Sequence, residues 1–189
     1  MASGMTHEPD DELIFVSNRA DTPCHAAVGH AASAWSWFEH MVDLTIAKLA
    51  DEKIEVALAL IAQIGSIHAK FDALIAILQR AEYSGVSPRT IKKLIRFSNE
   101  VRPLTIRRNR IIHDPVVLEH GEPKTVRLTT KGANGKLVYT LEKFDMAEVG
   151  DFIAKVHDRT VEFKKLRNEI REALAAKPHG MQTAERPAE

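Results

Sequence analysis

The sequence predicts a mainly α-helical protein: a four-helix up-and-down bundle with a β-hairpin inserted between the third and fourth helices. Apolar residues recur every three or four positions over long stretches, and helix-capping residues precede several of these stretches. One later segment instead alternates around a glycine-rich turn. At 189 residues the chain can bury a core, and we expect one domain at residues 21–177. Polar disordered tails are expected at residues 1–20 and 178–189.

The first two predicted helices occupy the first half of the chain. The first begins at Thr22-Pro23, because threonine is a good N-cap and proline fits the first helical position. The second runs from about Asp51 to Ala81. The apolar positions that place these helices are Trp35, Phe38, Val42, Ile46 and Leu49 in the first and Leu60, Ile64, Ile67, Phe71, Leu74 and Leu78 in the second.

The third predicted helix begins after Ser87, with Pro88 at its first position, and continues to His113. It ends there because Asp114 precedes a proline, and a residue in that position avoids the helical conformation. The apolar residues that mark its buried face are Ile91, Leu94, Val101, Leu104 and Ile111.

The hairpin is expected at about residues 116–143, around the turn at 132–135, which reads Gly-Ala-Asn-Gly. The segment 116–118 (Val-Val-Leu) is expected to add a third short strand. The last helix opens at Asp145, with Glu148 three positions later, which is the pattern of a capping box.

Composition limits the classes of function. The formal net charge is zero, with 26 basic and 26 acidic residues, so the total charge indicates neither nucleic acid nor any other partner. The single cysteine, Cys24, cannot form an internal disulfide, and the N-terminus has no apolar signal core. No apolar run is long enough to span a bilayer, so we expect a cytoplasmic protein without membrane contact.

The residues that best indicate a function lie on the third predicted helix. It is basic: eight arginine and lysine residues lie between Arg89 and His113, opposed only by Glu100. Such a band is typical of an anion-binding element, and equally of a solvated face that pairs with acids elsewhere. Arg108 lies on the apolar stripe, where a charge needs a partner or a function.

Arg108, Asn109 and His113 form a candidate site at the end of this helix. Asn109 and His113 are four residues apart and share a helix face. Arg108 and His113 are five apart, or about 140° around a regular helix. We therefore expect them to converge only where the helix distorts or ends, or across two chains.

The segment Arg108-Asn109-x-x-x-His113, late in a helical protein, resembles the active-site motif of HEPN-domain proteins. The second Arg-Asn pair, at Arg167-Asn168, has no histidine at that spacing. Arg107 also lies within the allowed spacing from His113, so the choice of Arg108 as the motif arginine rests on the adjacent Asn109. Many HEPN domains are homodimeric, metal-independent ribonucleases, some of them toxins, and others have lost catalysis.

The resemblance implies an endoribonuclease with Arg108, Asn109 and His113 as catalytic residues. Arg107, Arg110 and Arg102 are then the candidate RNA- or phosphate-binding residues. The implied partners are RNA, a second copy of the chain, and an antitoxin or other regulatory protein if the role lies in a toxin or defence system. The alternative is a non-catalytic HEPN-like module that binds RNA, nucleotide or protein.

We expect no cofactor and no metal site. His68 and Asp72 share a face of the second predicted helix, but two metal-ligating side chains without a third are more often a surface pair.

Overall fold

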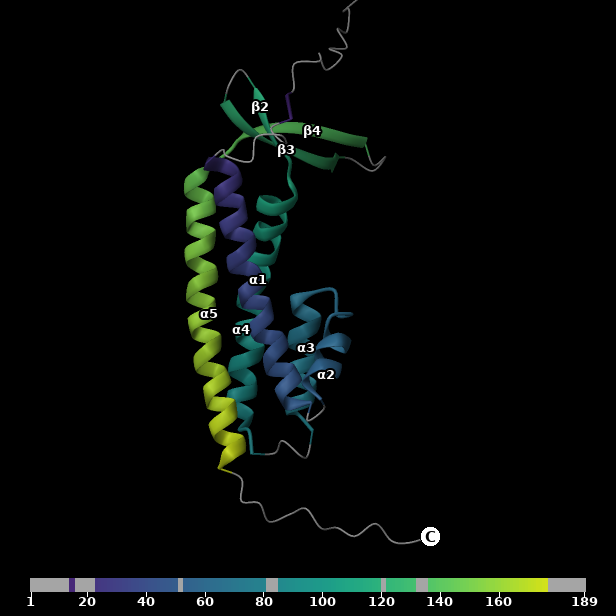
Figure 1. Cartoon of the computed structure of the whole chain (residues 1–189), viewed down its shortest axis with the longest axis vertical. Coiled ribbons are helices and arrows are strands. Elements are labelled where there is room, and N and C mark those ends of the chain that lie inside the picture. Colours follow the sequence, from purple (N-terminus) through teal and green to yellow (C-terminus); the bar gives the residue numbers. More distant parts are fainter. Residues whose placement is uncertain are drawn as a thin grey trace, which may run out of the picture. The chain divides into compact units, whose positions relative to one another are not determined.

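The computed structural model describes residues 14–15, 23–50, 53–80, 85–119, 122–131 and 136–176 of the 189-residue chain. The described residues are mainly helical, with a small antiparallel sheet (Figure 1). The helices are α1 (Pro23–Leu49), α2 (Ile54–Ile61), α3 (Ile67–Leu78), α4 (Pro88–His113) and α5 (Met146–Ala175). The strands are β1 (Ile14–Phe15), β2 (Val116–Glu119), β3 (Glu122–Lys131) and β4 (Lys136–Lys143).

The chain divides into two compact units. Unit 1 comprises Met1–Trp35 and Ile106–Lys155, and unit 2 comprises Ser36–Thr105 and Val156–Glu189. The predicted tails at 1–20 and 178–189 lie outside the described residues, except that Ile14 and Phe15 form β1. No helix in the described part of the chain is both long and apolar enough to cross a membrane.

The predicted four-helix bundle is not confirmed, because the helix expected from Asp51 to Ala81 is two helices. Between α2 and α3 lie residues 62–66, where Gly65 disfavours a helix interior and Ser66 caps the next helix. The side chain of Ser66 accepts a hydrogen bond from the backbone N–H of Ala69 at 3.1 Å. The described residues therefore form five helices, and the hairpin follows the fourth of them rather than the third.

Unit 2 has an aromatic core. Phe38 of α1, Phe71 of α3, Phe97 of α4 and Phe163 of α5 pack with ring centroids 5.7–6.3 Å apart. All four are at most 2% exposed. Phe38 and Phe71 were predicted on the apolar faces of their helices, whereas Phe97 was not among the residues predicted for the buried face of the third helix. Figure 1 shows α1, α4 and α5 side by side, in agreement with these contacts.

Unit 1 combines the sheet with segments of α1, α4 and α5. Its strands are ordered β1-β2-β3-β4, and every neighbouring pair is antiparallel. Trp35 stacks on Phe152, with ring centroids 6.2 Å apart. Asp145 caps α5 as the sequence predicted, since its Oδ1 accepts from the backbone N–H of Ala147 at 2.8 Å. The predicted hairpin turn at 132–135 lies outside the described residues.

Candidate functional site

The end of α4 places the candidate residues in unit 1. The helix continues to His113, and Pro115 follows one residue later, as the sequence predicted. Arg108, Asn109 and His113 thus occupy the last two turns of one helix. Asn109 and His113 are exposed, whereas Arg108 is partly buried.

The three side chains meet at Arg108. Its Nη1 donates to Oδ1 of Asn109 at 3.1 Å and lies 2.8 Å from Nε2 of His113. Arg108 and His113 both lie within α4, so the expectation that they converge only at a distorted or terminated helix, or across two chains, is wrong. The long arginine side chain spans the angle between positions 108 and 113. The guanidinium of Arg108 binds both other candidate residues at once.

The short contact determines which atom carries the hydrogen. A guanidinium has only N–H donors, so Nε2 of His113 must accept through its lone pair. A hydrogen bond in this contact uses the His113 tautomer that leaves Nε2 without a hydrogen. Nε of Arg108 is buried and has no hydrogen-bond partner, which fits the predicted position of Arg108 on the apolar stripe. The head group of Arg108 is therefore held at the edge of the core with donors directed at an exposed imidazole.

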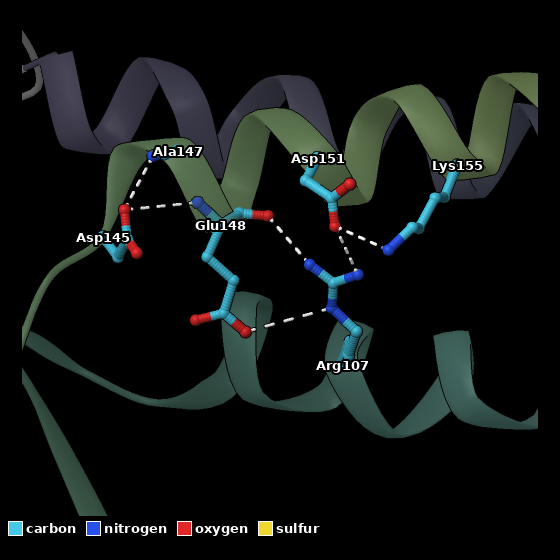
Figure 2. Close-up of polar contacts among 6 residues, drawn as sticks. All are labelled: Arg107, Asp145, Ala147, Glu148, Asp151 and Lys155. Carbon is cyan, nitrogen blue, oxygen red and sulfur yellow. Dashed lines mark hydrogen bonds and ion pairs between the residues drawn. The ribbon is translucent and has the colours of Figure 1, made fainter.

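Arg107 contacts residues of α5, and Figure 2 shows its contacts with Glu148 and Asp151. Its Nη1 lies 2.9 Å from Oδ2 of Asp151, and its Nη2 donates to the backbone carbonyl of Glu148 at 3.0 Å. Its guanidinium carbon lies 6.0 Å from the ring centroid of Phe152. The pKa of Asp151 is lowered most by its hydrogen bond with Lys155 and next by its hydrogen bond with Arg107. Arg107 thus joins α4 to the first turns of α5.

The other two candidate phosphate-binding residues lie apart from this contact. Arg110 is exposed and forms no ion pair with another described residue. It lines a cavity of about 50 Å³, and acidic residues, Glu142 and Asp145 among them, line the same cavity. Arg102 belongs to unit 2, where it is exposed.

The pKa of His68 depends on its burial and on the charge of Arg102. The sequence predicted a surface pair of His68 and Asp72. Burial lowers the pKa of His68, and the charge of Arg102 adds to this effect, while Asp72 opposes it. The nearest partner of His68 is Thr105, whose Oγ1 lies 3.2 Å from Nε2. Its Nδ1 is buried without a partner. His68 is therefore a partly buried histidine of unit 2 rather than a simple surface pair.

Sequence reasoning also missed the contribution of α5 to unit 1. Asp151 and Phe152 contact Arg107, and Lys155 pairs with the same Asp151 carboxylate. Of these contacts, only the Asp151–Lys155 pair has a local signal in the sequence, a spacing of four residues. Among the described residues, no group of three or more histidine, cysteine, aspartate or glutamate side chains is placed to hold a metal ion.

No protein-family model matches the chain, and the searches of curated proteins and of solved structures likewise return no match.

Proposed function

We propose that the protein is a HEPN-type endoribonuclease that cleaves RNA without a metal ion, in the cytoplasm, as part of a toxin or defence system. The contact of Arg108 with both Asn109 and His113 carries the proposal. It joins a cationic donor, an amide and an imidazole on the exposed end of one helix. An imidazole can transfer protons in phosphodiester cleavage by an internal nucleophile, and a guanidinium can stabilise the charge that develops on the phosphate.

The proposed reaction begins with attack of the ribose 2′-hydroxyl oxygen on the adjacent phosphorus. A P–O bond forms to the 2′-oxygen, the bond to the 5′-oxygen breaks, and a cyclic phosphate and a free 5′-hydroxyl result. A base takes the proton of the 2′-hydroxyl, and an acid protonates the departing 5′-oxygen. His113 is the proton-transfer residue.

Arg108 and Asn109 support the same reaction. The guanidinium of Arg108 can exchange its contact with His113 for a phosphoryl oxygen, which frees the Nε2 lone pair when substrate arrives. It then stabilises the charge that develops on the phosphate. Asn109 orients the phosphate or the imidazole. Arg110, which belongs to the same unit, is the further candidate phosphate contact, whereas Arg102 belongs to unit 2. Arg107 is held in intramolecular contacts and is the weaker candidate for the motif arginine.

A homodimer completes the proposed site. One histidine cannot easily act as base and acid at opposite ends of an in-line displacement, whereas two chains supply one histidine each. The exposed side chain of Ile106, at 56% exposure, lies on the same face of α4 as Asn109 and His113 at helical spacing. A single exposed apolar residue is common on protein surfaces, so the dimer proposal rests on the need for two histidines. The HEPN-like bundle architecture is part of the same proposal.

The alternative is a non-catalytic HEPN-like module that binds RNA, nucleotide or a protein partner. The observation in its favour is the occupied Nε2 of His113, because an imidazole held by Arg108 serves as a rigid hydrogen-bonding group. In this case Arg108 and His113 recognise an anion or a partner without transferring protons. A regulatory protein or antitoxin would bind this end of α4.

The test is cleavage of labelled single-stranded RNA by the purified full chain, with EDTA present throughout. We expect cleavage with the native chain and none with His113→Ala. The matched control is His157→Ala, which removes an exposed histidine of α5 and should leave activity unchanged. Full activity of His113→Ala, or a strict requirement for Mg²⁺ or Mn²⁺, would contradict the mechanism. RNA binding without cleavage by the native chain would favour the alternative.

A further inference from the structure

A cavity in unit 2 has a composition that the proposed function does not use. Its volume is about 220 Å³, and it lies between the C-terminal parts of α1 and α5. Its lining residues combine three cations with an otherwise mostly apolar surface and include no acid: Thr45, Lys48, Leu49, Arg167, Ile170, Arg171 and Leu174. The cavity shares no residue with the Arg108 site.

The helix dipole accounts for only one of the three cations. Lys48 lies in the last turn of α1, where the negative end of the dipole favours a basic residue. The last turn of α5 contains no basic residue, so Arg167 and Arg171 lie beyond the reach of its dipole. They are also four residues apart on one helix face, an arrangement in which like charges repel. Helix capping therefore does not explain the cluster.

No described acidic residue lines the cavity, and Glu172, the neighbour of Arg171 in sequence, is not among its lining residues. Two other described acids of the same helices are engaged elsewhere. Asp43 of α1 pairs with Lys70 at 2.8 Å, and Glu169 of α5 pairs with Lys93 at 2.8 Å. Lys48, Arg167 and Arg171 form no ion pair with any other residue that the structure describes. Within the described part of unit 2, three positive charges surround one cavity without a counter-charge. An anion bound there would replace repulsion by attraction.

The floor of the cavity is apolar. Ile170 is 2% exposed, and Leu49 and Leu174 are partly buried. The hydroxyl of Thr45 donates to the carbonyl of Met41 at 2.7 Å, so its hydrogen is already used. A bare inorganic anion would satisfy the cations but leave this floor in contact with water. An uncharged apolar molecule would cover the floor and leave the cations unpaired.

The geometry points to a binding site for a small amphiphilic organic anion, with its charged head at Lys48, Arg167 and Arg171 and its apolar body against Ile170, Leu49 and Leu174. The cavity is smaller than the roughly 300–1,000 Å³ of sites for drug-sized ligands, so the ligand is a short acyl or single-ring acid.

The experiment is a calorimetric titration of the full-length chain with octanoate as the probe, compared with octanol and with sulfate. We expect octanoate to bind with a Kd of about 1 mM or tighter. Binding should weaken as salt is raised, and octanol and sulfate should each bind at least about tenfold more weakly, because each satisfies only half of the site. No binding of octanoate, or equal binding of octanol or of sulfate, overturns the inference.

Variants locate the site. Arg167→Gln combined with Arg171→Gln should weaken octanoate binding at least about tenfold, with circular dichroism to verify the fold. The matched control is Arg89→Gln combined with Lys92→Gln, which removes two exposed charges from α4 and should leave binding unchanged. If the double variant is unfolded, Arg171→Gln alone is measured instead. Unchanged binding in the folded cavity variant, or equal loss in the control, refutes the assignment. Either outcome is independent of RNA cleavage.

Discussion

Arg107 and Arg108 are adjacent in sequence, yet their side chains make different contacts, and alanine substitution should separate the roles that we propose for them. Arg107→Ala removes a hydrogen bond to the carbonyl of Glu148 and a contact with the ring of Phe152. The first contributes about 1 kcal/mol and the second about 0.5–1 kcal/mol, while the exposed ion pairs are screened by solvent. We therefore expect a loss of about 2 kcal/mol in the free energy of unfolding. For a chain of this size that lowers Tm by about 4–8 °C.

Arg108→Ala should have the opposite effects: a small change in stability and a loss of RNA cleavage. It removes contacts to two exposed side chains, Asn109 and His113, and it also removes a buried Nε that has no partner. The loss of exposed contacts costs about 0.5 kcal/mol, and relief of the unpaired buried group offsets this, so Tm should change by no more than about 2 °C. RNA cleavage should nevertheless be lost, because the phosphate loses its stabilising cation.

The two assays are thermal unfolding monitored by circular dichroism, and RNA cleavage at a temperature where both variants are folded. Arg107→Ala should retain most of the native activity at that temperature. A large Tm decrease in Arg108→Ala with a small one in Arg107→Ala would refute the structural reasoning. Loss of cleavage in folded Arg107→Ala but not in Arg108→Ala would make Arg107 the motif arginine.

Two further predictions concern the composite site and the buried histidine. Purified mixed dimers of native and His113→Ala chains should cleave RNA at well below half the native rate, and a rate of one half would indicate independent sites. A monomer by light scattering at micromolar concentration would contradict the dimer itself. The lowered pKa of His68 means that the folded chain takes up its proton less readily than the unfolded chain, so the free energy of unfolding should be highest above the ordinary pKa of 6.5 and decrease as the pH falls below it. Denaturant titrations between pH 5 and pH 8 should show this slope in the native chain and a smaller slope in His68→Gln; equal slopes would assign the dependence to other groups.

Local signals in the sequence predicted the elements that hold the candidate site. Pro88 begins α4, the Asp114-Pro115 step ends it at His113, and Asp145 caps α5. The strand segments around the glycine-rich turn were also identified, because period-two alternation is a local property of the chain. The same reasoning failed between α2 and α3. There the apolar period continues through the break at Gly65-Ser66, and Leu60, predicted as core, is 65% exposed.

The sequence by itself also selected Arg108, Asn109 and His113, because their order and spacing are visible in the chain. Only the tertiary structure showed which groups Arg107 and Arg108 contact. The partner of Arg107, Asp151, lies 44 residues away, and no periodicity within α4 reveals which acid α5 will present to it. Helix caps and turns depend on neighbours within a few residues, whereas the partner of a charged side chain depends on how distant helices pack. The cationic cavity formed by α1 and α5 was hidden from sequence reasoning for the same reason.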